Sequence, residues 1–256
     1  MRRAAAVLAL LAAAGIAIVG AEAREAGGGR DRDRMTRYAS PGKIVGAEVA
    51  FQQLAQRKGQ WTAFRATAAP GATMFVPQPV DARDWLKRQK DPSKTVLWQP
   101  HQVWMSCDGS LAASYGAWQN TAGGFGYFTT IWQRQKDGGY KWVLDQGDAL
   151  SAPLEAPEMI AAAVAPCGPA RAQGDDAAPR PRPSRSAETT AQPVPLHGQS
   201  DDGTLAWAVE VAADCGRVFT VSLSKGPGTS LAPVLVKRAA PPGGSGGTPP
   251  ATCKAS

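Results

Sequence analysis

Histidine and cysteine are scarce in this sequence of 256 residues. The two histidines, His101 and His197, lack metal-ligand spacing, and the cysteines form no C-x-x-C pair, so the sequence indicates no zinc site. Its basic residues are scattered rather than interleaved with aromatic side chains, so nucleic acid is not an expected partner. No complete catalytic constellation stands out, and we expect no metal and no cofactor.

The N-terminus has the composition of a secretory signal. Met1-Arg2-Arg3 precedes an apolar run over residues 4–20, and Ala21-Glu22-Ala23 fits the small-x-small cleavage rule. We predict cleavage after Ala23, a periplasmic or secreted protein, and no stable membrane span in the mature chain. The alternative is an uncleaved anchor, since a run of about 17 residues is at the short limit for a span.

Four cysteines lie far apart, at Cys107, Cys167, Cys215 and Cys253. In an exported chain an even number favours disulfides, and four cysteines allow three connectivities. Among them we favour a Cys167–Cys215 pair, because it would hold a distal hairpin on the main domain across a linker.

Composition divides the chain into segments of different character. Stretches rich in Pro, Gly, Ala, Arg or Ser bury too little apolar surface to fold, whereas alternating or periodic stretches predict ordered structure. The predicted segments are a signal peptide (1–23), a disordered spacer (24–40), a main domain (41–166), a Pro/Ala/Arg-rich linker (167–200), a β-hairpin appendage (201–238) and a disordered tail (239–256). The hairpin is too small to be stable alone, so we expect it to dock on the main domain or to rely on a disulfide.

The main domain is organised around residues 95–149, where apolar and polar residues alternate between glycine-containing turns. This pattern predicts an antiparallel meander of strands 95–106, 111–120, 125–135 and 140–148. Helices are expected at 45–58, at 61–69, after an Asp81 cap and at 158–164. On the first helix, steps of three and four residues connect Ala47, Ala50, Phe51, Leu54 and Lys58, and this spacing puts the apolar members of the series on one face.

Large side chains occupy both faces of this meander. Simple alternation places Trp98 and Trp104 together on the first strand, and on the last strand it separates Trp142 and Leu144 from Asp145. A sheet of this kind needs cover on both faces. Helices can supply one cover, and either a partner subunit or the C-terminal hairpin the other.

The order helix, helix, strand, helix and four antiparallel strands resembles the nuclear transport factor 2-like superfamily, which includes ketosteroid isomerases and SnoaL-like polyketide cyclases. The wording FVPQPV…WQPHQVWMSCDG…GYFTTIWQRQ…YKWVLDQGD is similar to uncharacterised exported bacterial members. The resemblance covers roughly residues 45–148. It implies an α+β fold, with a cone-shaped curved antiparallel sheet wrapped by N-terminal helices around a pocket, and often a dimer through the open sheet face.

Asp145 is the candidate catalytic residue, because a carboxyl beside Trp142, Val143 and Leu144 would have a raised pKa in an apolar cavity. The alternative is an aspartate that faces solvent or caps a turn. Candidate pocket residues are aromatic or titratable side chains of the meander. The alternative for each is a structural role, in the core, in a cavity wall or in cross-strand packing. They are His101, Trp104, Tyr115, Trp118, Tyr127, Trp132 and Trp142.

Three functions remain open at this stage. The first is a non-catalytic exported protein that binds a small apolar ligand or a protein partner. The second is an isomerase, cyclase or hydratase-like enzyme with Asp145 as general base and Tyr115 or Tyr127 as hydrogen-bond donor. The third is a structural homodimer at the cell envelope.

Overall fold

The computed structural model describes residues 39–168 and 196–241, which all fall in one compact unit. The predicted signal peptide lies outside the described residues, as do nearly all of the spacer, most of the linker and most of the tail. No helix in the described part of the chain is long and apolar enough to cross a membrane.

Three helices cover one face of the main sheet: α2 (Pro41–Lys58), α3 (Gln60–Thr67) and α4 (Ala82–Leu86). Helix α4 begins after Asp81, whose side chain accepts a hydrogen bond from the Asp84 amide, as the sequence predicted. The predicted apolar face of α2 was partly wrong, since Ala50 is exposed. The buried residues recur at three- and four-residue steps and are Ile44, Glu48, Phe51 and Ala55.

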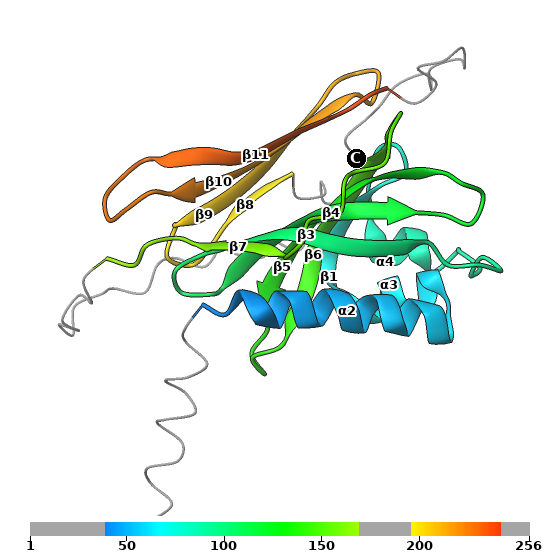
Figure 1. Ribbon diagram of the computed structural model, residues 1–256, viewed down its shortest axis with the longest axis horizontal. Coiled ribbons are helices and arrows are strands. Elements are labelled where there is room, and N and C mark those ends of the chain that lie inside the picture. The colour runs from blue at the N-terminus through cyan, green and yellow to red at the C-terminus, as the bar shows by residue number, and fades with distance from the viewer. Residues whose placement is uncertain (1–38, 169–195, 242–256) are drawn as a thin grey trace, which may run out of the picture. The chain divides into compact units, whose positions relative to one another are not determined.

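The main sheet has seven strands in the order β2-β1-β6-β5-β4-β3-β7 (Figure 1). Its centre is the predicted antiparallel meander, whose strand positions are confirmed to within two residues. The bounds are β1 (Ala68–Phe75), β2 (Pro79–Asp81), β3 (Leu97–Met105), β4 (Leu111–Gln119), β5 (Phe125–Arg134), β6 (Tyr140–Ala149) and β7 (Ala161–Val164).

Two bulges correct the predicted faces of the meander. In β3 the pairing with β4 shifts at His101, so Trp98 shares the helix side with Val103 and Met105, while Trp104 faces the other way. In β6 the pairing with β5 shifts at Val143. Simple alternation was wrong at both places, because the extra residue in each strand moves every later side chain to the opposite face.

Residues 158–164 were predicted to be helical, and the structure contradicts this. Instead, β7 pairs in parallel with the edge strand β3. The alanines of this segment favour a helix locally, but its backbone groups gain hydrogen bonds from the edge of β3. The Ala165 amide extends this pairing by donating to the Met105 carbonyl at 2.9 Å.

A second sheet lies at the C-terminal end of the chain, with strands in the order β11-β10-β9-β8. Its first strand falls in the predicted linker, so the predicted hairpin is a four-stranded sheet. The bounds are β8 (His197–Gln199), β9 (Leu205–Val211), β10 (Arg217–Ser224) and β11 (Leu231–Ala239).

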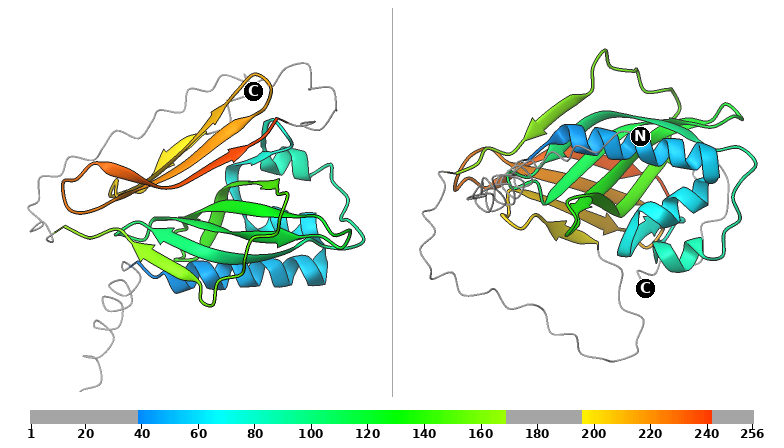
Figure 2. Two further views of the ribbon diagram at one scale, coloured as in Figure 1. Left: turned by 45° about the horizontal axis from the view of Figure 1, so that its top comes forward. Right: turned by 90° about the horizontal axis from the view of Figure 1, so that it is seen from below.

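The main sheet lies between the helices and the C-terminal sheet (Figures 1 and 2). One core forms between the helices and the sheet around Phe51, Trp132 and Trp142. A second core forms between the two sheets, where Ile131 and Leu144 meet Phe219 and Val221. The C-terminal sheet therefore supplies the second cover that the two-faced meander requires.

The predicted Cys167–Cys215 pair was wrong. Cys167 forms a disulfide with Cys107, and their Cα atoms are 5.2 Å apart. Because β7 runs alongside β3, the chain brings residue 167 next to the turn that follows β3. Cys215 is also disulfide-bonded, and Cys253 lies outside the described residues.

Candidate functional site

A cavity of about 480 Å³ opens on the helix side of the main sheet. Many of its lining side chains are aromatic, and these come from α2, α3, β1, β3, β4 and β5. The aromatic lining residues are Phe51, Trp61, Phe64, Phe75, Trp98, Trp118 and Phe128, and the polar ones are Gln60, Asn120, Thr130, Asp145, Gln146 and Asp148. Such a wall suits a small organic molecule with few polar groups.

Asp145 reaches this cavity because of the bulge at Val143. In an unbroken alternation Asp145 would lie on the side opposite Trp142, whereas the extra residue returns it to the helix side. Its side chain is half-buried and accepts a hydrogen bond from the Thr130 hydroxyl at 2.8 Å. Burial raises the pKa of Asp145 to about 7; the Thr130 hydrogen bond opposes this rise, and the nearby Glu48 carboxylate adds to it.

Glu48 is a second carboxyl on the helix side, and it was not predicted from the sequence. It is 1% exposed, and three side chains donate to it: Ser114 Oγ at 2.5 Å, Trp132 Nε1 at 3.0 Å and Trp98 Nε1 at 3.0 Å. Burial raises the pKa of Glu48, while these three hydrogen bonds act in the opposite direction. Its position four residues after Ile44 was the signal that could have placed it on the buried face.

Trp98 separates this cavity from a second one of about 530 Å³, which also lies along α2. The indole donates to Glu48 and packs edge-to-face on Phe51, with ring centroids 4.8 Å apart. The second cavity is lined by Glu48, His101, Trp118 and the segment that precedes β7. Burial lowers the pKa of His101, which lines this cavity.

The structure divides the candidate pocket residues into three groups. Trp118 lines both cavities, and His101 lines the second. Trp132 and Trp142 are buried in the core beneath the first cavity, where the Trp142 indole donates to Thr67 Oγ1 at 2.9 Å. The remaining three lie on the opposite face of the sheet, against the C-terminal sheet, and are Trp104, Tyr115 and Tyr127.

The C-terminal sheet supports one wall of the first cavity. The Arg217 guanidinium lies 4.7 Å from the centre of the Phe75 ring, which lines the cavity. Arg217 also donates to Gln146 Oε1 at 3.2 Å and to the Gly147 carbonyl. Burial lowers the pKa of Arg217, with Tyr127 and Asp148 opposing the shift.

The described residues contain no group of three metal-ligating side chains placed to hold an ion. Two carboxyl residues, Asp145 and Asp148, line the first cavity beside its aromatic side chains, and Asp145 is the one with a raised pKa. A carboxyl with a pKa near 7 can donate a hydrogen bond when neutral and accept a proton when ionised.

The structure has an α+β fold with helices on one face of the main sheet, which is consistent with the arrangement that the resemblance implies. Among solved structures, this chain is similar to a protein from Parabacteroides distasonis that is provisionally classed as a ketosteroid isomerase. The identity is 12%, the match covers 45% of this chain and 97% of that one, and the TM-score is 0.36.

Two other solved structures have different descriptions. One is a CaMKII hub from S. rosetta, at 16% identity, 44% and 98% coverage and a TM-score of 0.35. The other is an NTF2-like protein of unknown function from Pseudomonas aeruginosa, at 20% identity, 43% and 96% coverage and a TM-score of 0.32. No family model and no curated protein matches the sequence. Likeness at this level carries no argument about activity.

Proposed function

We propose that the first cavity binds a small, mostly apolar organic molecule, and that Asp145 anchors its one polar group. The observation that carries this proposal is the position of Asp145, which a strand bulge places among aromatic side chains with a pKa of about 7. A cavity of about 480 Å³ has the size of known small-molecule sites.

Two compounds with the same aromatic ring system test this proposal directly. 1-Naphthol and naphthalene have nearly the same apolar surface, but only naphthol carries a hydroxyl that Asp145 can engage. We expect the wild-type protein to bind naphthol about tenfold more tightly, since a hydrogen bond to a carboxyl contributes about 1.5 kcal/mol. Tryptophan fluorescence gives the readout, because Trp61, Trp98 and Trp118 line the cavity.

The Asp145→Asn variant should lose most of this preference and still bind naphthalene. Glu210→Gln is the matched control, because Glu210 is exposed and lines neither cavity. Failure of both compounds to bind the wild-type protein would contradict the proposal. An unchanged preference in Asp145→Asn would remove Asp145 from it.

Catalysis with Asp145 as general base is the second candidate, and the raised pKa of Asp145 favours it. This proposal does not use Tyr115 and Tyr127 as donors, because both pack on the other face of the sheet. Thr130 donates a hydrogen bond to Asp145 and supplies the hydroxyl beside the proposed base.

A substrate that reports on any base in an apolar pocket is 5-nitrobenzisoxazole. Asp145 would take its ring proton, the N–O bond would break, and the electron pair would leave on the phenolate oxygen. We expect turnover to rise with pH through about 7 and to be absent in Asp145→Asn. Binding of naphthol without this turnover would favour the non-catalytic reading.

We also propose that the protein is exported with its disulfides formed. The Cys107–Cys167 bond supports this, because disulfides persist in oxidising compartments. The intact mass of protein from a periplasmic fraction tests the proposal. It should match a chain that begins at residue 24 with oxidised cysteines, and a full-length reduced chain in the cytoplasm would contradict it.

A further inference from the structure

Two turns of the chain have nearly the same sequence. Residues 106–111 read S-C-D-G-S-L between β3 and β4, and residues 200–205 read S-D-D-G-T-L between β8 and β9. The glycines of the two turns, Gly109 and Gly203, both have positive φ, at 66° and 71°. Four of the six positions are identical, and a fifth exchanges one hydroxyl residue for another.

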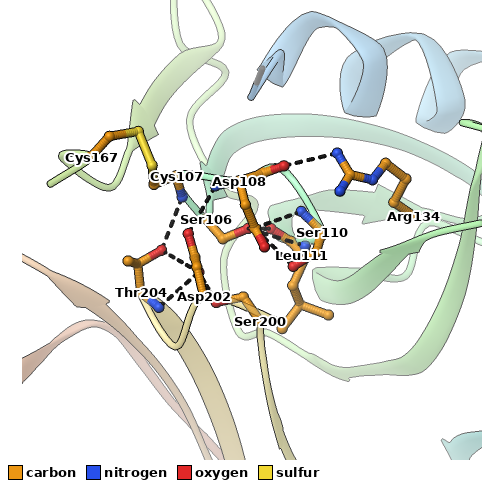
Figure 3. The surroundings of a disulfide bond; sticks show 10 residues. All are labelled: Ser106, Cys107, Asp108, Ser110, Leu111, Arg134, Cys167, Ser200, Asp202 and Thr204. Carbon is orange, nitrogen blue, oxygen red and sulfur yellow. Dashed lines mark hydrogen bonds between the residues drawn. A yellow bond between two sulfur atoms is a disulfide. The ribbon is translucent and has the colours of Figure 1, made fainter. Parts of the chain in front are cut away.

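The hydrogen bonds inside the two turns are also the same. In the first turn, Asp108 Oδ1 accepts from the hydroxyls of Ser106 and Ser110 and from the Ser110 amide. In the second, Asp202 Oδ1 accepts from the hydroxyls of Ser200 and Thr204 and from the Thr204 amide. Figure 3 shows both aspartates with these partners.

The likeness extends to the strands that follow. The order β6-β5-β4-β3 in the main sheet matches β11-β10-β9-β8 in the C-terminal sheet. The register matches as well. In the main sheet, β6 has its bulge at Val143, next to the pair Ile131–Leu144. In the C-terminal sheet, β11 has its bulge at the equivalent residue, Val234, next to the pair Val221–Leu235. A bulge at the same place in both copies is not required by a generic hairpin.

The two copies pack on each other symmetrically. The Cys107 amide donates to Thr204 Oγ1 at 2.9 Å, and the equivalent Asp201 amide donates to Ser110 Oγ at 2.9 Å (Figure 3 shows the first of these). Equivalent leucines, Leu111 and Leu205, are both buried between the sheets. Reciprocal contacts of this kind are the signature of an isologous, two-fold interface.

The outer face of the second copy differs from the cavity side of the main sheet. Thr130 pairs with Asp145 in the main sheet, and the equivalent pair in the C-terminal sheet is Thr220 with Val236. Val236 is 48% exposed, so no layer equivalent to the helices buries it. The second copy therefore keeps the face that docks and lacks the face that holds the cavity.

We propose that residues 197–239 are a second copy of the meander, and that this copy occupies within one chain the surface on which a second subunit would dock. This face of the main sheet packs against another meander of the same kind, and the C-terminal sheet of the same chain is that meander. The protein is then complete as a monomer, and the homodimer expected from the sequence does not form through this face.

Sedimentation velocity of the full-length oxidised protein, from micromolar concentrations upward, tests the occupancy of this face. A single species with the mass of one chain is expected throughout. A concentration-dependent dimer would overturn the proposal.

Amide hydrogen exchange measured by NMR tests the reciprocal docking. Ser110→Ala removes the acceptor of the Asp201 amide, and Thr204→Val removes the acceptor of the Cys107 amide. Each variant should raise the exchange rate of its partner amide in the other turn about fivefold or more. Ser151→Ala, at an exposed site, is the control and should change neither rate. Unchanged exchange in both turn variants would overturn the proposed docking.

Discussion

At the scale of single residues, the cavity side of the sheet holds two carboxyls in different surroundings. Glu48 accepts three hydrogen bonds and is closed off from solvent, so its role is to hold Trp98, Ser114 and Trp132 in place. Asp145 accepts one hydrogen bond from Thr130 and faces the cavity. Asp145 is therefore the carboxyl that we propose engages a ligand in the first cavity, and Glu48 positions the wall around it.

The stability of the protein should depend on pH through Asp145. Its pKa is about 7 in the folded chain and near 3.8 when unfolded, so between these values the unfolded chain releases a proton that the folded chain keeps. The free energy of unfolding of the wild type, relative to Asp145→Asn, should therefore fall as pH rises from about 4 to about 7, by at most roughly 4 kcal/mol. Urea unfolding of both proteins at several pH values measures this difference, and a difference that rises with pH would contradict it.

Replacing Glu48 by Gln should destabilise the protein. Glutamine has one acceptor oxygen, so either the Trp98 indole or the Ser114 and Trp132 donors lose their partner at a cost of about 1–3 kcal/mol. Urea unfolding of the wild type and of Glu48→Gln measures this loss in the free energy of unfolding. The cost should be smaller in a Trp98→Phe background, where one donor is already gone. Additive effects of the two substitutions would show that Glu48 does not hold Trp98.

At the scale of elements, the bulges decide which side chains meet. The strands could be predicted because alternation and glycine turns mark them, yet nothing in the sequence marks His101 or Val143 as an extra residue. The prediction thus recognised Asp145 by its apolar neighbours but assigned it to the face opposite Trp142. Glu48 was missed because a charged residue interrupts an apolar stripe, and its hydrogen-bond donors come from strands far along the chain.

The close approach of β5 to its neighbours depends on Gly126. A Cβ at this position would overlap the Asp148 carbonyl oxygen and the Trp118 ring, which lines both cavities. Gly126→Ala should therefore cost about 1–3 kcal/mol and alter the fluorescence of Trp118.

Gly46→Ala is the matched control for this substitution. Gly46 lies in α2 with open space at its Cβ, so alanine there should stabilise the protein by about 0.5–1 kcal/mol. Thermal unfolding compares the two variants. Equal effects in the same direction would contradict the close packing assigned to Gly126.

At the scale of the whole molecule, the C-terminal sheet completes the main domain. It covers the face opposite the cavity, and Arg217 supports the Phe75 ring in the cavity wall. The sequence indicated that the distal segment would dock on the main sheet, because a sheet with two apolar faces needs two covers. It did not indicate the pairing of β7 with β3, because that pairing joins residues distant in sequence, and it assigned the three residues of β8 to the linker.

The Cys107–Cys167 disulfide joins the turn after β3 to the end of β7 across 60 residues. In the chain-entropy model, a closed loop of this length contributes about 4 kcal/mol to stability. The Cys107→Ser/Cys167→Ser variant should show most of this loss in urea unfolding. A reductant should then lower the stability of the wild type more than that of the variant, and equal losses would show that this bond contributes little.

The central claim is that a bulged strand holds Asp145 in an aromatic cavity with a pKa near neutrality. The most direct test is a pH titration of the Asp145 carboxyl carbon by ¹³C NMR, with Asp145→Asn to assign the resonance. The account predicts a midpoint of about 7, and a shift in that midpoint when 1-naphthol is added. A midpoint near 4, the ordinary value for an exposed aspartate, would contradict the account.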